Sequence, residues 1–436
     1  MQDHSYDWVR HVHRITLYNT VNEAHQHVSD RKARLYLHLD MNCFYAQVEQ
    51  QAYNLYGMPV IVGAWRGENG IPKGIVTTAS YEARAFGIKT GMSHLEAVRL
   101  CPHLIPLRGN FVKYQSISQD IADILRHFTP TLESYSIDEF FLDITHHAQS
   151  SKGELIQFAR EVKAEIHRQL GLVCSLGIAR SKTYAKVASD LEKPDGLSVI
   201  FDETDVQERI HPLPVGSIWG IGRKRIAKLN AEGIHTIADA VSRGSLVFER
   251  LFGASFGKML YLTCAGRDVA KVMDQSSHIP REISYMHSFT KPSLDSDEIR
   301  TELLKAIALI AYRMRGYGKK ASRYCCYLRL EGSKWKGLDL PFHTEGPTSV
   351  DDFILKACET TVMHTVSALL RKRVAVRGIG FNTMNMSDEQ QEDLFFREDP
   401  VQASLYQVLD KVNNTFGQGS ITKASLVFRK AGKHLP

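Results

Sequence analysis

The stretch Ser134-Tyr135-Ser136-Ile137-Asp138-Glu139-Phe140-Phe141-Leu142-Asp143-Ile144-Thr145 sets two adjacent carboxylates between two β-rich segments. Successive residues of a strand point to opposite faces, so Asp138 and Glu139 reach one place only if they lie at the apex of a hairpin. Apolar neighbours make this acidic pair costly through desolvation and like-charge repulsion, and a bound cation relieves both costs. A hydrated acidic turn is the alternative, and this stretch alone leaves both open.

A third carboxylate favours the cation. Residues 34–41 alternate strictly, which predicts a strand with three leucines on a buried face and Tyr36, His38 and Asp40 on the other. Asp40 is therefore expected to end a strand with its carboxylate outside the core. Asn42 is predicted to be the N-cap of a helix that starts at the next residue, and the free N–H groups of a first helical turn favour phosphate. Three carboxylates beside a helix N-terminus suit a divalent metal ion with a nucleoside triphosphate.

The composition is that of a soluble globular protein with two to four domains, because 436 residues with 43% hydrophobic content can form several cores. No apolar run approaches 18 residues, and the N-terminus lacks the basic-then-apolar order of a signal peptide. We therefore expect a cytosolic protein without a membrane segment. The seven cysteines form no Cys-x-x-Cys pair, which argues against a zinc site or a disulfide framework.

The positive charge is concentrated in one segment of the chain. The net charge is +6, and residues 285–386 alone hold 16 basic and 10 acidic side chains. A module that lies along a polyanion would have this excess, although a merely solvated basic face is the alternative. The order of β-rich and helical segments in this module predicts a four-stranded sheet with two helices.

Two features near the acidic residues predict phosphate contacts. Tyr81 and Arg84 are three residues apart on a short helix that Gly87 stops, so a hydroxyl and a guanidinium share one face. An ordinary surface pair is the alternative. Lys193 ends a later helix, because Pro194 cannot continue it, and is a further candidate for binding phosphate.

Residues 201–271 are predicted to be all-helical and contain a helix-hairpin-helix pattern. Gly220 and Gly222 form the turn, and Arg223 and Lys224 follow at once. Such a turn exposes backbone N–H groups to a phosphate while the cations add charge, so it binds a DNA backbone without reading its sequence. An ordinary helical hairpin turned by glycine is the alternative.

The ends of the chain are less informative. Residues 1–33 carry five histidines, to which we assign no function. Gln391, Leu394 and Phe395 lie in a short peptide that can seat in a partner's groove, although such peptides also arise by chance. Residues 401–412 are predicted to form an amphipathic helix.

Together these residues carry a family resemblance. The chain resembles the Y-family translesion DNA polymerases of the DinB/UmuC superfamily, bacterial type, over roughly residues 34–386. The resemblance rests on five motifs in the same order: residues 40–47, 78–84, 136–139, 185–196, and the helix-hairpin-helix.

The resemblance implies an α+β fold with right-hand polymerase architecture. The palm would be ferredoxin-like (34–43 and 110–200), followed by small fingers (44–109), a helical thumb (201–271), a linker (272–284) and a little finger (285–386). Residues 1–33 would be an N-terminal extension and 387–436 a C-terminal tail.

The resemblance also implies roles for individual residues. Asp40, Asp138 and Glu139 would hold two Mg²⁺ ions, with the carbonyl of Met41 completing one of them. Tyr45 would be the steric gate against a ribose 2′-hydroxyl. Further contacts with the nucleotide would come from Thr78, Tyr81, Arg84 and Lys193, and Ile75 and Thr77 would cover the nascent base pair. DNA would contact Gly220, Gly222, Arg223 and Lys224, and a sliding clamp would bind Gln391, Leu394 and Phe395.

The implied activity is insertion of dNTPs opposite damaged bases on a primer–template, with low fidelity, no proofreading domain, a link to the SOS response and action as a monomer. The sequence departs from the family pattern at Cys43, Ser80, Arg180-Ser181 and Glu192, positions that bear on fine substrate preference and include no catalytic group. Two rivals remain. A non-enzymatic relative would not need all three carboxylates, and a diguanylate-cyclase-type enzyme would not need a helix-hairpin-helix or a basic module.

Overall fold

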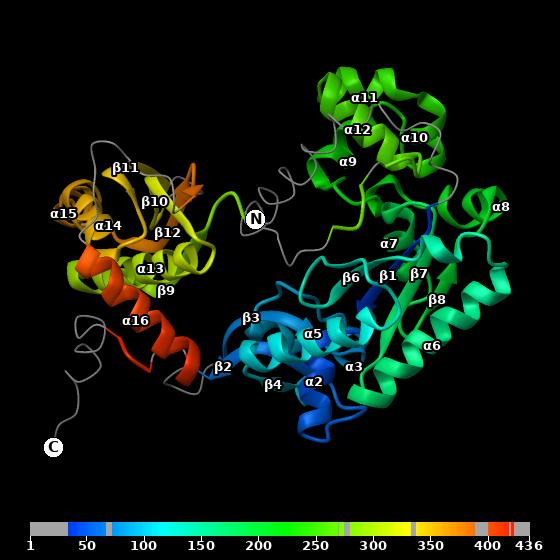
Figure 1. Cartoon of the computed structure of the whole chain (residues 1–436), viewed down its shortest axis with the longest axis horizontal. Helices are drawn as coiled ribbons and strands as arrows, with labels where there is room; N and C mark the ends of the chain where they lie inside the picture. Colours follow the sequence, from blue (N-terminus) through cyan, green and yellow to red (C-terminus); the bar gives the residue numbers. More distant parts are fainter. Residues whose placement is uncertain are drawn as a thin grey trace. The chain divides into compact units, whose positions relative to one another are not determined.

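The structure is a computed structural model that describes residues 34–66, 72–268, 270–273, 280–332, 337–388, 400–417 and 420–422. The chain divides into two compact units, residues 1–277 and 278–436, and this division falls inside the predicted linker. Figure 1 labels the elements of both units.

The first unit is built around a five-stranded sheet with strand order β5-β6-β1-β7-β8. The central strand, β1, pairs antiparallel with β6 on one side and with β7 on the other, while β8 runs parallel to β7. The predicted acidic hairpin is present, because β5 pairs antiparallel with β6 and residues 135–138 connect them. The strands are β1 (Tyr36–Met41), β5 (Leu132–Ser134), β6 (Glu139–Asp143), β7 (Cys174–Ala179) and β8 (Leu197–Val199).

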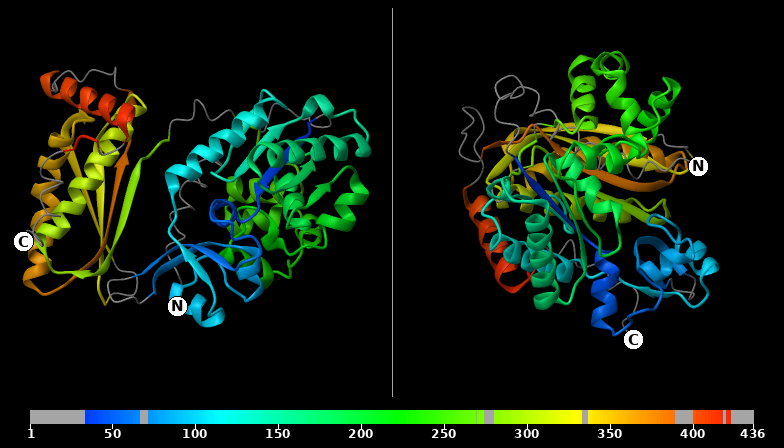
Figure 2. Two further views of the ribbon diagram at one scale, coloured as in Figure 1. Left: turned by 90° about the horizontal axis from the view of Figure 1, so that it is seen from below. Right: turned by 90° about the vertical axis from the view of Figure 1, so that its right-hand side faces the viewer.

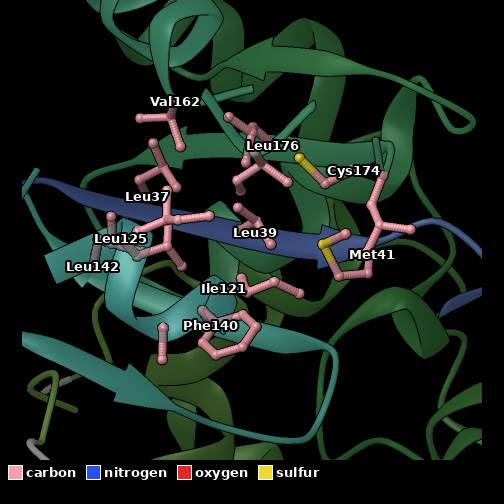
Figure 3. Close-up of a cluster of buried hydrophobic side chains, with 14 of the residues drawn as sticks. Leu37, Leu39, Met41, Ile121, Leu125, Phe140, Leu142, Val162, Cys174 and Leu176 are labelled. Carbon is pink, nitrogen blue, oxygen red and sulfur yellow. The ribbon is translucent and has the colours of Figure 1, made fainter. Parts of the chain in front are cut away.

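Helices cover both faces of this sheet. The helices α5 (Phe111–Arg126) and α6 (Lys152–Leu170) enclose the main core, in which Leu37, Leu39 and Met41 are buried (Figure 3). On the other face, α7 (Lys182–Leu191) packs against β1 and β7. A short 3₁₀ turn (Thr145–His147) links β6 to α6.

The expectation that Tyr36 and His38 lie away from the core is wrong. Their exposed fractions are 2% and 0%, because α7 and its neighbours cover that face of β1. Alternation reveals that a strand has two faces but does not reveal whether the second face is covered. Of the three residues on this face of β1, Asp40 at the end of the strand stays partly exposed.

The segment predicted to form the fingers contains a three-stranded sheet and short helices. The sheet has the order β3-β2-β4, and its core holds Ile61 and Val76. The elements are α2 (Phe44–Ala52), β2 (Val60–Arg66), β3 (Pro72–Ala79), α3 (Tyr81–Ala85), α4 (His94–Leu100) and β4 (Ile105–Leu107). The first of these helices, α2, instead places Phe44 and Val48 in the core of the five-stranded sheet.

Residues 201–268 are helical, as predicted, with only an isolated bridge between Pro214 and Thr236 among them. The principal helices are α9 (Arg223–Ala231), α10 (Ile237–Arg243), α11 (Ser245–Phe252) and α12 (Ala254–Cys264), preceded by short turns at 203–210 and 215–217. Their buried side chains join those of α7 in one core.

The second unit has the predicted four-stranded sheet with helices on one face (Figure 2). The strand order is β11-β10-β12-β9, and all pairs are antiparallel. The elements are β9 (Ser284–Ser293), α13 (Ser296–Gly316), β10 (Lys319–Leu330), β11 (Gly337–Thr348), α14 (Asp351–Cys358), α15 (His364–Arg371) and β12 (Val376–Met384). A π-helical turn (Glu359–Met363) joins α14 to α15.

Two elements extend this unit beyond the predicted little finger. The strand β13 (Ser387–Asp388) pairs with β10, and α16 (Pro400–Phe416) contains the predicted amphipathic helix. Arg315 of α13 holds α16 through Asp410 at 2.6 and 3.0 Å.

One helical stretch of the described residues, Asp351–Arg371, is long and apolar enough to span a membrane by length and composition. A single such helix is weak evidence, since core helices of soluble proteins pass the same test. Here Ile354, Cys358, Val362 and Val366 are buried in the core of the second unit.

Candidate active site

Asp40 and Glu139 lie opposite one another in the five-stranded sheet. Asp40 of β1 is the register partner of Glu139 of β6, and the next N–H of β1, that of Met41, donates to the carbonyl of Asp138 at 2.9 Å. The backbone therefore brings Asp40 together with two acidic residues that lie 98 or more positions further along the sequence. Met41 itself is buried, with its side chain in the main core.

Asp138 occupies the turn that precedes β6. Its Oδ1 accepts a hydrogen bond from the hydroxyl of Ser136 at 2.6 Å, and its own N–H donates to that hydroxyl oxygen at 3.3 Å. These bonds fix the turn and hold one oxygen of the carboxylate toward Ser136.

Two lysines neutralise the other two carboxylates. Lys193 Nζ lies 2.8 Å from Asp40 Oδ2 and 2.6 Å from Asp190 Oδ1. Lys186 Nζ contacts Glu139 Oε1. Lys186 belongs to α7, and Lys193 lies two residues beyond the end of this helix at Leu191. The prediction that Lys193 itself ends the helix is therefore wrong by two residues.

The environment disfavours the ionised form of two of the carboxylates. Burial raises the pKa of Asp40 to about 6, with Lys193 opposing the shift and Glu139 adding to it. Burial also raises the pKa of Asp138, although the hydrogen bond from Ser136 opposes this. Burial works against the protonated form of Lys193, but the charges of Asp40 and Asp190 outweigh it and raise the pKa of Lys193 to about 12.

The donor atoms of this site fit a hard divalent cation, which prefers carboxylate and carbonyl oxygens. Within the described residues, however, no three His, Cys, Asp or Glu side chains are gathered as a preformed metal cluster. In this structure Ser136 bonds Asp138, and lysines contact Asp40 and Glu139. The fit therefore rests on the type of donor and on the shared location of the carboxylates.

Tyr45 projects from the first turn of α2 into an aromatic cluster beside these carboxylates. Its ring stacks on Tyr114 at a centroid distance of 4.4 Å and meets Phe111 edge-on at 5.7 Å. Burial raises the pKa of Tyr45, and the charge of Asp138 adds to the shift. Tyr114 is in turn fixed by buried Glu49, whose Oε1 accepts its hydroxyl hydrogen at 2.6 Å.

Tyr81 and Arg84 do share a face of α3. The Arg84 guanidinium lies 4.7 Å from the centre of the Tyr81 ring, and Arg84 Nε donates to the carbonyl of Ala79 at 3.0 Å. Thr78 and Thr77, both half-buried, lie on β3 immediately before this helix, and Ile75 of the same strand is 57% exposed.

The predicted cap at Asn42 is wrong. The helix α2 begins at Phe44, and its N-cap is Cys43 in the left-handed region (φ 38°), with no side-chain capping bond. Asn42 instead bonds across the site, because its Nδ2 donates to the Tyr81 hydroxyl at 3.0 Å and its Oδ1 accepts from the N–H of Asp195 at 3.2 Å. These long-range partners outweigh the local capping preference.

Two of the predicted DNA-contact residues, Gly220 and Gly222, lie in a tight turn before α9. Gly220 has φ 88°, a conformation that favours glycine, and Gly222 is the N-cap of α9. Arg223 and Lys224 are the first residues of that helix. The side chain of Arg225 stabilises the turn by donating to the carbonyl of Gly220 at 2.6 Å. Gln391, Leu394 and Phe395 lie outside the described residues.

Sequence reasoning missed several residues of this site, most notably Lys186, Asn42 and the pair Tyr114–Glu49. Lys186 had a usable signal, since it lies in the segment predicted to be a helix that leads to Lys193. The contacts of Asn42 and Tyr114 join distant segments and leave no local pattern.

Comparison with known proteins places this geometry in a family. Residues 39–190 match the impB/mucB/samB family, and residues 203–234 match the HHH motif of the IMS family. DNA polymerase IV 1 of Bacillus subtilis (strain 168) is 32% identical over 409 residues, which cover 92% of this chain and 95% of that protein. The solved Y-family DNA polymerase chimera Dbh-Dpo4(243-245)-Dbh matches with a TM-score of 0.69 and 27% identity, over 80% of this chain and 98% of that one. The chain belongs to the Y-family DNA polymerases.

Other similar proteins agree with this assignment of a Y-family polymerase. DNA polymerase IV of Pelotomaculum thermopropionicum is 33% identical over 390 residues, covering 88% of this chain and 93% of that protein. The structure titled "Insertion ternary complex of Dbh DNA polymerase" matches with a TM-score of 0.54 and 27% identity, over 80% of this chain and 98% of that one. The predicted family and right-hand polymerase architecture are thus confirmed, and the protein is a DNA-directed DNA polymerase that uses DNA and dNTPs. The two rival interpretations gain no support.

Proposed function

We propose that this Y-family polymerase extends a primer past damaged template bases, using two Mg²⁺ ions held by Asp40, Asp138 and Glu139 with the carbonyl of Met41. The observation that carries the proposal is the pairing of Asp40 with Glu139 next to the turn that holds Asp138. When bound, a pair of divalent ions activates the primer 3′-hydroxyl and stabilises the leaving pyrophosphate.

The chain's own residues supply position and charge. Tyr45 closes the sugar side of the pocket against a 2′-hydroxyl, and its stack on Tyr114 supports this role. Arg84, Tyr81 and Lys193 hold the triphosphate, with Thr78 beside them. Support comes from the guanidinium of Arg84 packed on Tyr81 and from Lys193 next to Asp40.

Tolerance of damaged bases is supported by the modest size of the fingers. Their two helices after β3 have five and seven residues, and Ile75, which would cover the nascent base pair, is 57% exposed. A small cover makes few contacts with the base pair, so we also propose low fidelity.

The DNA backbone would be held by the turn before α9 and the start of that helix, through Gly220, Gly222, Arg223 and Lys224. We propose that the protein acts as a monomer in the cytosol and binds a sliding clamp through the Gln391 peptide.

The test is primer extension with Mg²⁺ by purified protein, comparing wild type with Asp138→Asn. Losing one of three anionic ligands should lower the extension rate by roughly 10²–10³-fold or more. Asp143→Asn, a carboxamide at the far end of β6, is a matched control that should extend like wild type. Wild-type extension by the Asp138→Asn variant would overturn the assignment of the site.

Lesion tolerance is tested separately on a template with an abasic site. The protein should insert a nucleotide opposite the site and extend beyond it. A complete stop at this and other lesions, with normal copying of undamaged template, would refute the translesion part alone.

A further inference from the structure

Tyr135 joins the catalytic turn to two other elements. It lies three residues before Asp138, in the segment between β5 and β6. Its ring meets Phe141 of β6 at 5.7 Å, Lys186 Nζ of α7 at 5.7 Å and the ring of Trp219 at 4.9 Å. Lys186 also contacts Glu139, so Tyr135 is linked to Asp138 along the chain and to Glu139 through Lys186.

Trp219 belongs to the helix-hairpin-helix. It stands immediately before Gly220, and buried Ile218 and Ile221 anchor it on both sides. These anchors are 1% and 4% exposed, which ties the position of the indole to the core of this helical region. Trp219 itself is half-buried and meets Tyr135 edge-on, with an interplanar angle of 82°. Among the ring pairs of the described residues, the Trp219 indole is what links the turn proposed to bind DNA with the turn that carries Asp138.

The contact joins two uncharged side chains: the rings pack edge to face, and a side-chain hydrogen bond links Trp219 to Tyr135. Burial raises the pKa of Tyr135 and the charges of Glu139 and Glu133 add to the shift, while the hydrogen bond from Trp219 lowers the pKa, so the hydroxyl keeps its proton at neutral pH. An edge-to-face pair of this kind depends on ring orientation and is lost when one ring is replaced by an aliphatic side chain.

We propose that Trp219 is a positioning residue: DNA seated on the turn at Gly220–Lys224 fixes the Trp219 indole, which through Tyr135 and Lys186 fixes the turn that carries Asp138 and Glu139. This inference rests on the proposed roles of the carboxylates and of the helix-hairpin-helix. It adds that the two sites are energetically coupled, and such coupling acts in both directions.

The first experiment measures amide hydrogen exchange without catalysis. The full-length protein is kept in EDTA, with and without a saturating primer–template, and exchange is followed over residues 132–143. In wild type, DNA should slow exchange in this segment by about fivefold or more. Trp219→Leu, which removes both the ring and the indole N–H, should lose most of that protection at saturating DNA.

A matched control comes from the same helical region. Phe252→Leu removes a ring of α11 that packs against the core of this region but contacts neither Tyr135 nor Trp219 among the ring pairs of the described residues. It should leave the DNA-dependent protection intact. If it abolishes the protection as Trp219→Leu does, the effect is general loosening of the thumb and the proposal fails.

The second experiment is a double-mutant cycle on single-nucleotide insertion at saturating DNA. Trp219→Leu and Tyr135→Leu should each lower kcat/KM for dNTP by about tenfold, and the double variant should lose about tenfold rather than a hundredfold. Additive losses would overturn the coupling. If Trp219→Leu does not fold, Tyr135→Leu tests the same contact, because it removes the other partner.

The outcomes separate this inference from the proposed function. If Asp138→Asn extends primers normally, the proposed site is wrong and the coupling falls with it. If Asp138→Asn is inactive but Trp219→Leu keeps wild-type protection by DNA, the site stands and the coupling alone is refuted.

Discussion

Asp40 and Glu139 are register partners on neighbouring antiparallel strands, and each of the two carboxylates meets a different lysine from a single stretch of chain. Lys186 lies within α7, whereas Lys193 lies beyond the last residue of that helix, Leu191, so the helix and the segment after it together supply the two cations. The two positive charges compensate a pair of acids that burial would otherwise make costly. Asp138, in the adjoining turn, depends on Ser136 instead.

This arrangement predicts a pH-dependent effect of Asp40→Asn on stability. The pKa of Asp40 is raised to about 6 from the ordinary 3.8, so between these values the folded chain binds a proton more tightly than the unfolded chain. Wild type therefore loses stability as the pH rises from about 4 to about 6, whereas the carboxamide of the variant cannot ionise. In the presence of a chelator, the free energy of unfolding of the variant should therefore rise relative to that of wild type between about pH 4 and about pH 6. The relative change should be at most about 3 kcal/mol. Urea denaturation from pH 4 to 8 measures the difference, and a constant difference would contradict the prediction.

Tyr45→Ala should relax discrimination between ribonucleotides and deoxyribonucleotides. We propose that the Tyr45 ring blocks the space that a ribose 2′-hydroxyl needs. Removing the ring opens this space, so the ratio of kcat/KM for dNTP over rNTP should fall by roughly 10–200-fold. Tyr45→Phe is the matched control, because it keeps the ring that stacks on Tyr114. Single-nucleotide insertion with paired dCTP and CTP gives the ratio. An unchanged ratio in the alanine variant would reject the gate.

Local sequence patterns were enough to find the acidic residues. The hairpin of Asp138 and Glu139 followed from two β-rich segments around an acidic pair, and the strand of Asp40 followed from alternation. The shared face of Tyr81 and Arg84 followed from helical spacing. In each case the interacting residues belong to one short segment or to elements whose periodicity is strong.

Contacts between distant segments could not be predicted in this way. Asn42 has a high intrinsic preference for helix N-caps, yet Tyr81 and Asp195 offer it partners that only the folded chain brings near. His38 occupied the polar side of an alternating strand, and nothing local indicated that α7 would cover it. Its Nδ1 lies 2.8 Å from the Ser189 hydroxyl of that helix, 151 positions away.

Glu133→Ala should destabilise the first unit strongly. Glu133 and Lys182 form a buried ion pair at 2.6 Å, with side chains 6% and 4% exposed, and Glu133 also accepts from the N–H of Met273 at 2.8 Å. Removing the acid leaves a buried ammonium without its counter-ion, at a cost of about 3–5 kcal/mol. Urea denaturation measures the loss.

The matched control replaces both partners of this pair. Glu133→Leu combined with Lys182→Met removes both charges while keeping much of the buried volume, so it should recover most of the stability lost in Glu133→Ala. If the double variant is as unstable as the single one, the loss comes from the backbone contact with Met273 or from packing, not from an unpaired charge.

Deleting Leu394 and Phe395 should abolish stimulation by the sliding clamp that we propose as a partner. These two residues are the apolar anchors of the peptide, and a groove that binds an extended segment gains most of its affinity from such anchors. The basal extension rate should stay unchanged, because the deletion lies outside the unit that carries Asp40 and Glu139. Replacing Glu398 and Asp399 with serine is a matched control in the same segment and should leave the stimulation intact. Processivity measured with and without a loaded clamp decides the matter: stimulation of the deletion variant to the wild-type level would mean that the clamp, if it binds, holds another surface.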